Sequence, residues 1–230
     1  MTEFSGLSRD SLKQRALRSF RRGHGSRPDV RLVSIGDDQV VLKDHNGCDR
    51  WFGLLIGPLL VWREARALRR LDSVTGTPRV LVRLDRRALL LEYLPGTPIT
   101  KADVHAWEPF FARLEALVEE MHRVGVAHCD LRSPTNTLIG PDGEPYLVDF
   151  VASVTKASGW NPVGRWIFSR FRVADREAVV KLKSIVAPEL LSSGERQILA
   201  RRMGPVECAA RWLGSSVRDL SRKLFTGTSK

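Results

Sequence analysis

The chain has 230 residues, of which 43% are hydrophobic and 27% are charged, so it can bury a core and sits near the upper size for one compact domain. Its formal net charge of +11 favours phosphate-bearing partners such as nucleic acid, an anionic membrane or a nucleotide. The three cysteines, Cys48, Cys129 and Cys208, are scattered, which excludes a disulfide framework and indicates a reducing compartment. The longest uncharged run, 51–62, is too short for a transmembrane helix, which needs about 20 apolar residues.

The first expected element is a basic amphipathic helix over residues 7–20, with Ser8 as its N-cap. The glycines and the proline of 23–28 end this helix. The apolar positions that predict the helix are Leu7, Leu12, Leu17 and Phe20.

Two pairs of strands and one helix are expected next. Apolar runs flanked by polar turns predict the strands, and the segment between the two pairs has helical spacing. The strand pairs lie at 29–35 with 40–43 and at 80–82 with 88–93, and the helix lies at 60–71.

After Gly96 the pattern becomes mainly helical. Residues 107–124 repeat apolar side chains every three or four positions, which predicts a long helix with one buried face that stops at Gly125. A short hairpin at 137–148 follows, and helical spacing returns beyond Asp175. A strand-rich part with one helix, followed by a helix-rich part with one hairpin, predicts an α+β fold of two unequal lobes.

The C-terminal segment has an apolar stripe beside basic side chains. It can be an interfacial helix on an anionic membrane or a terminal helix packed on the larger lobe, and the sequence does not decide between these alternatives. The stripe consists of Val206, Ala210, Leu213, Val217, Leu220 and Leu224, next to Arg211, Arg218, Arg222 and Lys223.

Side chains that are candidates for a functional site are concentrated in the stretch from His128 to Asn136. It follows the long helix and contains Asp130, and the next hairpin delivers Asp149 directly before Phe150. Phosphoryl transfer needs cations on the phosphates and a group that orients the acceptor hydroxyl. Two aspartates and an asparagine at this spacing favour that chemistry over turn-forming roles.

Two further residues fit the same chemistry when they are taken together. Lys43 ends an apolar strand, where it can pair with ATP phosphates, and Glu64 on the next helix can hold its ammonium group. Alone, Lys43 is explained as a solvated strand-edge charge, and Glu64 as an i,i+4 partner of a neighbouring arginine.

These motifs resemble the protein-kinase-like superfamily, over roughly residues 29–200. The resemblance implies a bilobal protein-kinase-like fold with a small β-rich N-lobe, a helical C-lobe and no large activation segment. It implies that Asp130 orients the acceptor, that Lys43 and Glu64 form the phosphate-binding pair, and that Asn136 and Asp149 bind Mg²⁺. The cofactors would be ATP and Mg²⁺, with the backbone around Glu92 and Leu94 as the adenine-binding hinge.

The departures from the common kinase pattern are specific. The arginine before the catalytic aspartate is Cys129, the step from Asp130 to Asn136 is six positions, and Val151 replaces the glycine after Asp-Phe. These features resemble small bacterial RIO-like and lipopolysaccharide (Kdo)-kinase-like proteins. No Gly-x-Gly-x-x-Gly loop precedes Lys43, so Gly23, Gly25 and Ser26 form the candidate phosphate loop, with a flexible break after a helix as the alternative.

The sequence therefore predicts a kinase that transfers the ATP γ-phosphate to a hydroxyl of a protein or of an envelope glycolipid. The alternative is a kinase-shaped ATP-binding regulator or slow ATPase that acts on RNA or a protein. The expected location is cytoplasmic, with peripheral attachment to the inner face of the membrane left open. The expected segments are a basic helix with the phosphate loop (1–28), the N-lobe (29–94), the C-lobe (95–202) and the C-terminal helix (203–230).

Overall fold

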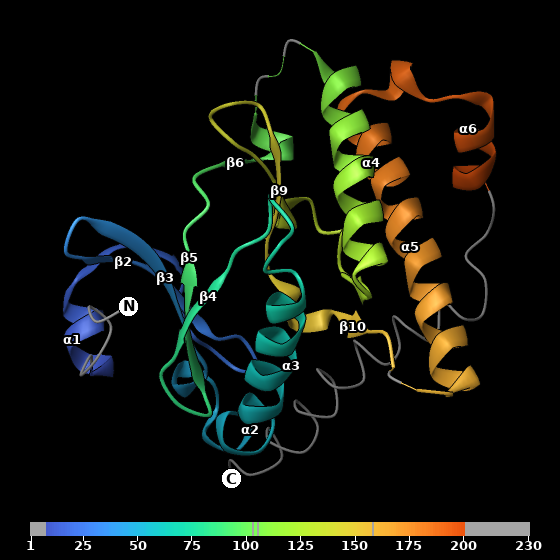
Figure 1. The fold of residues 1–230 in the computed structure, drawn as a ribbon. Helices are drawn as coiled ribbons and strands as arrows, with labels where there is room; N and C mark the ends of the chain where they lie inside the picture. The colour runs from blue at the N-terminus through green and yellow to red at the C-terminus, as the bar shows by residue number, and fades with distance from the viewer. Residues whose placement is uncertain (1–7, 103, 105, 158, 201–230) are drawn as a thin grey trace, which may run out of the picture. The chain divides into compact units, whose positions relative to one another are not determined.

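A computed structural model describes residues 8–102, 104, 106–157 and 159–200 (Figure 1). The predicted stripe at 206–224 lies outside the described residues. The described chain divides into two compact units. The first comprises 8–66 and Arg79–Tyr93, and the second comprises Ala67–Pro78 and 94–200. No helix in the described part of the chain is both long enough and apolar enough to cross a membrane.

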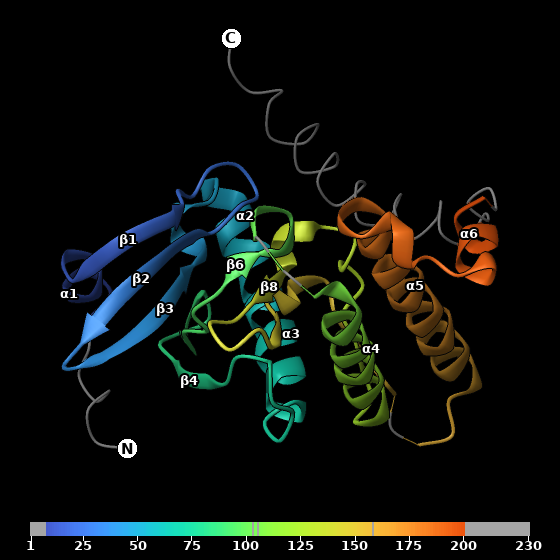
Figure 2. The ribbon, with the colours of Figure 1, turned by 90° about the horizontal axis from the view of Figure 1, so that it is seen from above.

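The first unit is built on a five-stranded antiparallel sheet, whose strands follow the order β1-β2-β3-β5-β4. Figure 2 shows β1, β2 and β3 side by side. Both predicted strand pairs are present, and the turn at Gly36 takes a positive φ of 60° that suits glycine. The strands are β1 (Ala16–Arg21), β2 (Asp29–Ile35), β3 (Asp38–Asp44), β4 (Val80–Arg83) and β5 (Ala88–Glu92).

The predicted helix over residues 7–20 is wrong beyond its first turns. Helix α1 covers only Arg9–Gln14, capped by the Ser8 hydroxyl, and β1 follows at Ala16–Arg21. The apolar side chains of Leu17 and Phe20 are exposed on this edge strand instead of forming one buried helical face. Backbone pairing with β2 decides the conformation of β1, and spacing along a single segment does not reveal such pairing.

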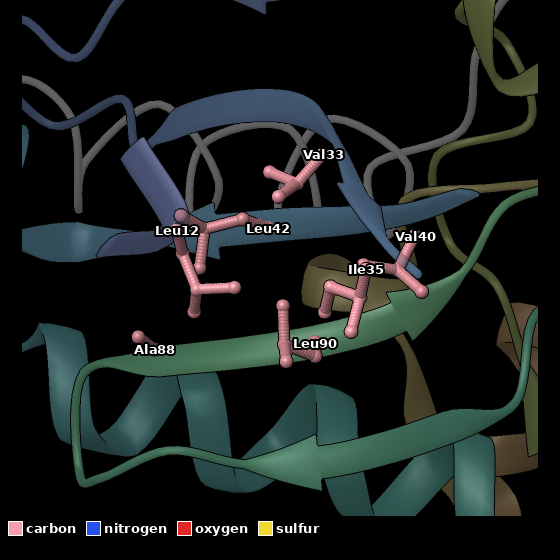
Figure 3. Packing of buried hydrophobic residues seen from close by; sticks show 7 residues of the cluster. All are labelled: Leu12, Val33, Ile35, Val40, Leu42, Ala88 and Leu90. Carbon is pink, nitrogen blue, oxygen red and sulfur yellow. The ribbon is translucent and has the colours of Figure 1, made fainter. Parts of the chain in front are cut away.

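Helix α1 packs on one face of the sheet through Leu12, which is fully buried (Figure 3). Salt bridges of 3.1 Å from both Arg9 Nε and Lys13 Nζ to Asp44 Oδ2 fix the helix at the end of β3. The buried cluster on this face consists of Leu12, Val33, Ile35, Val40, Leu42, Ala88 and Leu90.

Two helices follow β3 and the 3₁₀ turn η1 (His45–Gly47): α2 (Arg50–Leu55) and α3 (Gly57–Arg70). Helix α3 covers the predicted helix at 60–71 except its last residue and starts three residues earlier than predicted. The division between the two units falls inside it. Several large apolar side chains from the uncharged run at 51–62 are exposed on α2 and α3. They are Trp51, Leu54, Leu55, Leu59 and Trp62.

The second unit is mainly helical. Helices α4 (Trp107–Arg123) and α5 (Pro162–Val186) lie side by side, and α6 (Ser193–Ala200) packs on α5 (Figure 1). The predicted helix at 107–124 is confirmed, whereas α5 begins 13 residues before Asp175 because Pro162 and the Asn161 cap start it. The buried apolar face of α4 includes Phe110, Phe111, Leu114, Val118 and Met121.

Short strands and turns connect these helices. The predicted hairpin is present as β8 with β9, and β6 joins it to form a three-stranded sheet. The turns η3 and η4 directly follow Ser133 and Asp149 and carry the motif residues. The elements are β6 (Thr97–Pro98), η2 (Ile99–Lys101), β7 (Val126–Ala127), η3 (Pro134–Asn136), β8 (Thr137–Ile139), β9 (Pro145–Leu147), η4 (Phe150–Ala152), β10 (Val154–Thr155) and η5 (Pro188–Leu190).

Candidate active site

In the first unit, Lys43 of β3 and Glu64 of α3 form a buried ion pair. The distance from Lys43 Nζ to Glu64 Oε1 is 2.8 Å, and the two residues are 4% and 1% exposed. Side chains alternate along a strand, so Leu42 points into the cluster with Leu12 while Lys43 points to the opposite face, where α3 lies. The structure thus brings together two residues that, taken singly, have ordinary surface explanations.

In the second unit, Asp130 and Asn136 are joined directly. Asn136 Nδ2 donates to Asp130 Oδ2 and to the Asp130 backbone oxygen, both at 3.0 Å. The backbone closes the same loop, because Ser133 N donates to Asp130 O and Asn136 N donates to Ser133 O. The extra residue in the six-position step therefore sits in a compact turn that still places the asparagine against the aspartate.

Asp175 anchors this loop and was not predicted as a site residue. Its buried carboxylate accepts from His128 N and Cys129 N at 2.8 Å each, and from His122 Nε2 at 3.0 Å. Because two of these donors are backbone groups directly before Asp130, α5 fixes the path of the loop that carries Asp130. The sequence contains one sign that Asp175 is special: it is an acidic residue within an apolar stripe of helical spacing, between Phe168 and Val179.

Two residues beside the site hold a backbone conformation that L-residues rarely adopt. Cys129 and Asp149 both have φ of 67° and are the only described non-glycine residues with positive φ. Such conformations persist where surrounding contacts impose them, and they cluster at functional sites. Here the Asp175 carboxylate holds Cys129 N.

His128 connects the Asp130–Asn136 loop to the segment that carries Asp149. Its Nε2 lies 3.0 Å from Val148 O, and its ring centroid lies 4.5 Å from that of buried Phe150. Val148 N also donates to Asn136 O at 2.9 Å. These contacts bracket Asp149 on both sides and keep it in the neighbourhood of Asn136.

The donor set of this loop suits Mg²⁺. Asn136 uses its amide nitrogen towards Asp130, so its amide oxygen is the atom left to coordinate a cation, and Asp149 supplies a carboxylate. Oxygen ligands are those that Mg²⁺ prefers, and the ion is commonly held by one or two protein groups together with substrate phosphates. Among the described residues, no cluster of three or more His, Cys, Asp or Glu could hold a metal by itself. The residues therefore fit a cation that arrives with a nucleotide.

The predicted adenine hinge lies where the chain passes from one unit to the next, after Tyr93. The carboxylate of Glu92 forms a salt bridge of 3.1 Å with Arg79, and its backbone N–H donates to Arg79 O. Binding of adenine by the backbone of Glu92 and Leu94 stays a prediction.

The candidate phosphate loop with Gly23, Gly25 and Ser26 is the connection between β1 and β2. His24 and Arg27 exchange two backbone hydrogen bonds and form a tight turn, and Gly25 has a positive φ of 59°. A Cβ on Gly23 would lie 2.7 Å from the Gly47 backbone, so glycine is required there. The segment with Cys48 lies next to this turn, since Asp49 N donates to Gly25 O. Burial and the nearby Asp44 and Asp49 carboxylates raise the pKa of the Cys48 thiol to about 12. The segment is a structured hairpin turn, and its role in phosphate binding stays a prediction.

Comparison with known proteins gives matches by structure. The chain is similar to the Rio2 kinase from Chaetomium thermophilum, with a TM-score of 0.54 and 16% identity over 89% of this chain and 75% of that one. It is also similar to the Rio2 kinase-ADP/Mg²⁺-phosphoaspartate complex from the same organism, with a TM-score of 0.57 and 17% identity over 94% and 69% of the two chains.

The fold is that of a protein kinase. It has a small sheet-based N-lobe and a helical C-lobe, as the motifs imply. By sequence, no protein-family profile and no curated protein matches the chain. The likeness to Rio2 kinase, at 16 and 17% identity, concerns the fold.

Proposed function

We propose that the protein is an ATP- and Mg²⁺-dependent kinase that transfers the γ-phosphate of ATP to a hydroxyl group. The observation that carries this proposal is the pairing of Asp130 with Asn136 in a loop whose backbone is held by buried Asp175. This is a preorganised acceptor-orienting carboxylate, and phosphoryl transfer depends mainly on positioning and electrostatics. A solved structure of similar fold contains ADP and Mg²⁺, which supports the same cofactors here.

Each residue has one task in this proposal. Asp130 accepts a hydrogen bond from the acceptor hydroxyl and takes its proton as the oxygen bonds to phosphorus and ADP leaves. Lys43, oriented by Glu64, places positive charge on the phosphates. Asn136 and Asp149 would hold Mg²⁺ through oxygen atoms, and the bound ion would neutralise charge on the phosphates.

The direct test is transfer of labelled γ-phosphate by the purified full chain in the presence of Mg²⁺. Asp130→Ala should lower turnover by at least about 10²-fold while ATP still binds, because the base contributes to chemistry and not to nucleotide affinity. Asp149→Ala should abolish Mg²⁺-dependent nucleotide binding. Asp142→Ala, in the exposed β8–β9 turn, serves as the matched control and should leave both properties unchanged. Absence of Mg²⁺-dependent ATP binding by the wild-type chain would overturn the proposal.

We also propose that the acceptor is a hydroxyl of a protein or of a glycolipid sugar, and that the protein works in the cytoplasm, at or near the inner face of the membrane. Arginine and tryptophan side chains exposed on α2, α3 and α5 support a location close to an anionic surface. Label that appears in an extracted glycolipid fraction and not in protein would identify the acceptor class. Label only in protein would identify the other.

A second candidate function is slow ATP hydrolysis through an aspartyl phosphate. A Rio2 kinase structure of the same fold is described as a phosphoaspartate complex, which favours this candidate. A carboxylate oxygen would attack the γ-phosphorus as ADP leaves, and water would then release inorganic phosphate and restore the carboxylate. Label bound to the chain and released by hydroxylamine would identify this route, and label stable to hydroxylamine would contradict it.

A further inference from the structure

A pocket in the second unit is lined mainly by basic side chains and lies away from the Asp130–Asn136 pair. Its volume is about 560 Å³, and it is formed by the end of α4, the chain after β10 and the first half of α5. Both helices belong to the same unit, and Figure 1 shows them side by side. The lining residues are Glu119, His122, Arg123, Lys156, Arg165, Phe168, Ser169 and Arg172.

The charge of this pocket is strongly positive. Four lining residues are Lys or Arg and one is acidic. The acidic one, Glu119, accepts two hydrogen bonds from Arg176, at 2.5 and 2.9 Å. This hydrogen bonding from Arg176 holds the pKa of the Glu119 carboxyl below its usual value. The side chains of Lys156 and Arg165 form no ion pair with any described residue. The pocket therefore has cationic groups that are not neutralised by the neighbouring protein.

Two residues that line the pocket also have a buried polar atom without a hydrogen-bond partner among the described residues. His122 is 3% exposed and uses Nε2 towards Asp175, while its Nδ1 is buried without a hydrogen-bond partner. The nearest ionic neighbour of Nδ1 is Glu119 Oε1, at 3.9 Å, which is beyond hydrogen-bond range. The Nε of Arg172 is likewise buried and without a partner. Leaving such groups unsatisfied is unfavourable, and a polar ligand that reaches them would remove this cost.

We propose that this pocket binds a phosphate group. Arginine side chains match phosphate oxygens with paired N–H donors, and Lys156 adds a point charge. The Nδ1 of His122 can accept from a phosphate hydroxyl or, on a protonated ring, donate to a phosphate oxygen. Four cationic side chains attract a dianion, so its electrostatic contribution to binding is more favourable than that of a neutral ligand of equal size.

Two sources can present this phosphate, a lipid headgroup or a soluble phosphorylated metabolite. Apolar side chains on and beside the first turns of α5 are exposed next to the pocket: Trp160 (90%), Val163 (66%), Trp166 (57%) and Ile167 (38%). Tryptophan beside arginine is characteristic of protein surfaces that lie at the headgroup level of a membrane. The shared chemistry is the phosphate, and the two sources give different experimental results.

The pocket is connected to the catalytic loop by a short chain of hydrogen bonds. His122 lines the pocket and holds Asp175, and Asp175 holds the backbone N–H groups of His128 and Cys129 directly before Asp130. A bound phosphate that fixes the His122 ring would therefore also fix the carboxylate that positions the loop. We expect ligand binding to raise protection of the Cys129 amide from hydrogen exchange.

Binding is tested by titrating the full chain, without nucleotide, with glycerol 3-phosphate. The Arg165→Gln/Arg172→Gln double variant should weaken binding by about tenfold or more, since two charged hydrogen-bonding groups are lost. The matched control is Arg170→Gln/Lys181→Gln, which removes the same charge from exposed positions of α5 outside the pocket. Equal loss in both double variants, or no binding by the wild-type chain to either glycerol 3-phosphate or lipid vesicles, would overturn the proposal. Because no ATP is present, the result does not depend on the proposed kinase activity.

The second arm distinguishes the sources. The wild-type chain is mixed with phosphatidylcholine vesicles with and without phosphatidylglycerol and sedimented. A lipid source predicts binding that needs phosphatidylglycerol and falls in both Arg165→Gln/Arg172→Gln and Trp160→Ser/Trp166→Ser. A soluble source predicts that the tryptophan variant binds glycerol 3-phosphate normally and that vesicle binding is insensitive to the pocket arginines. Urea unfolding of each variant shows whether it remains folded, so a loss of binding can be assigned to the pocket.

Discussion

At the scale of single residues, the buried Asp175 connects α5 to α4 and to the chain directly before Asp130. Its carboxylate accepts from two backbone N–H groups and one imidazole, and all three donors belong to α4 or to the chain directly before Asp130. We predict that Asp175→Asn lowers the free energy of unfolding by about 2–3 kcal/mol, because an amide presents a donor to at least one of these donors. Urea unfolding measures the change.

The exposed residue Asp38, at the start of β3, supplies the control for this prediction. Asp38→Asn should change stability by less than about 0.5 kcal/mol. The phosphotransfer rate of Asp175→Asn should fall along with its stability, since the positions of Cys129 and Asp130 depend on the same carboxylate. An Asp175→Asn chain as stable as wild type would contradict the anchoring role.

Asp130, Asn136 and Asp149 can be proposed as site residues from the sequence because they lie at short, characteristic spacing. Three residues within 20 positions, in the context of a helix and a hairpin, restrict the alternatives. Asp175 is different, because its partners are 46 and 47 positions away and are backbone groups. Only the packing of α5 against β7 and α4 brings them together, and no local pattern encodes that contact.

At the scale of elements, β3 and α3 are joined by the Lys43–Glu64 pair. Removing one member of a buried ion pair leaves a charge without its counter-ion and costs about 3–5 kcal/mol, whereas replacing both by apolar groups can be nearly neutral. We therefore predict that Lys43→Met and Glu64→Leu each destabilise the protein strongly, and that the double variant is less destabilised than the sum of the two. Urea unfolding of the four chains gives the coupling energy.

Nucleotide binding separates the two roles of this pair. All three variants should lose ATP affinity, including a double variant that regains stability, because an apolar pair cannot contact phosphates. Additive effects on stability would show that the pair is not coupled. ATP affinity retained in the stable double variant would remove Lys43 from the proposed phosphate contacts.

Helix α6 is attached to α4 and α5 through a small ionic cluster. Lys183 Nζ lies 2.6 Å from Glu195 Oε1 and 3.0 Å from Glu115 Oε1. Burial alone would raise the pKa of Glu195, but the hydrogen bonds from Lys183 and from Ser192 outweigh it and lower the pKa below its usual 4.5. A carboxyl with a lower pKa in the folded state stabilises the protein above 4.5, and this contribution disappears as the pH falls through the folded-state pKa.

The resulting prediction compares Glu195→Gln with wild type across pH. Near neutral pH the variant should be less stable by about 1 kcal/mol. The difference should shrink as the pH falls below 4.5 and should vanish once the carboxyl of Glu195 is protonated in the folded chain. Urea unfolding at several pH values gives this difference, and a gap that stays constant into acid would contradict the ionic attachment of α6.

The elements differ in how well the sequence predicted them. Helix α4 and the strand pairs β2–β3 and β4–β5 have strong periodicity within one segment or a short hairpin, so local pattern was enough. Strand β1 was read as helix, because Leu12, Leu17 and Phe20 fit a helical spacing that the pairing of β1 with β2 overrides. The start of α5 is not predicted either, since exposed Val163 and Trp166 give this helix no buried stripe in its first turns.

At the scale of the whole molecule, a nucleotide that binds only the folded chain must stabilise it. At a concentration of about 100 times its dissociation constant, a ligand adds about 2.7 kcal/mol. For a chain of this length, that corresponds to a rise in melting temperature of roughly 5–10 °C. We predict this rise for ADP with Mg²⁺ and a much smaller one for ADP with a chelator, because Asn136 and Asp149 offer oxygen ligands to a cation that arrives with phosphates.

Differential scanning calorimetry measures the shift, and Asp149→Asn should remove most of the part that depends on Mg²⁺. An equal shift with and without Mg²⁺ would mean that the nucleotide binds without the proposed metal ligands, and no shift in either condition would contradict nucleotide binding by this kinase fold.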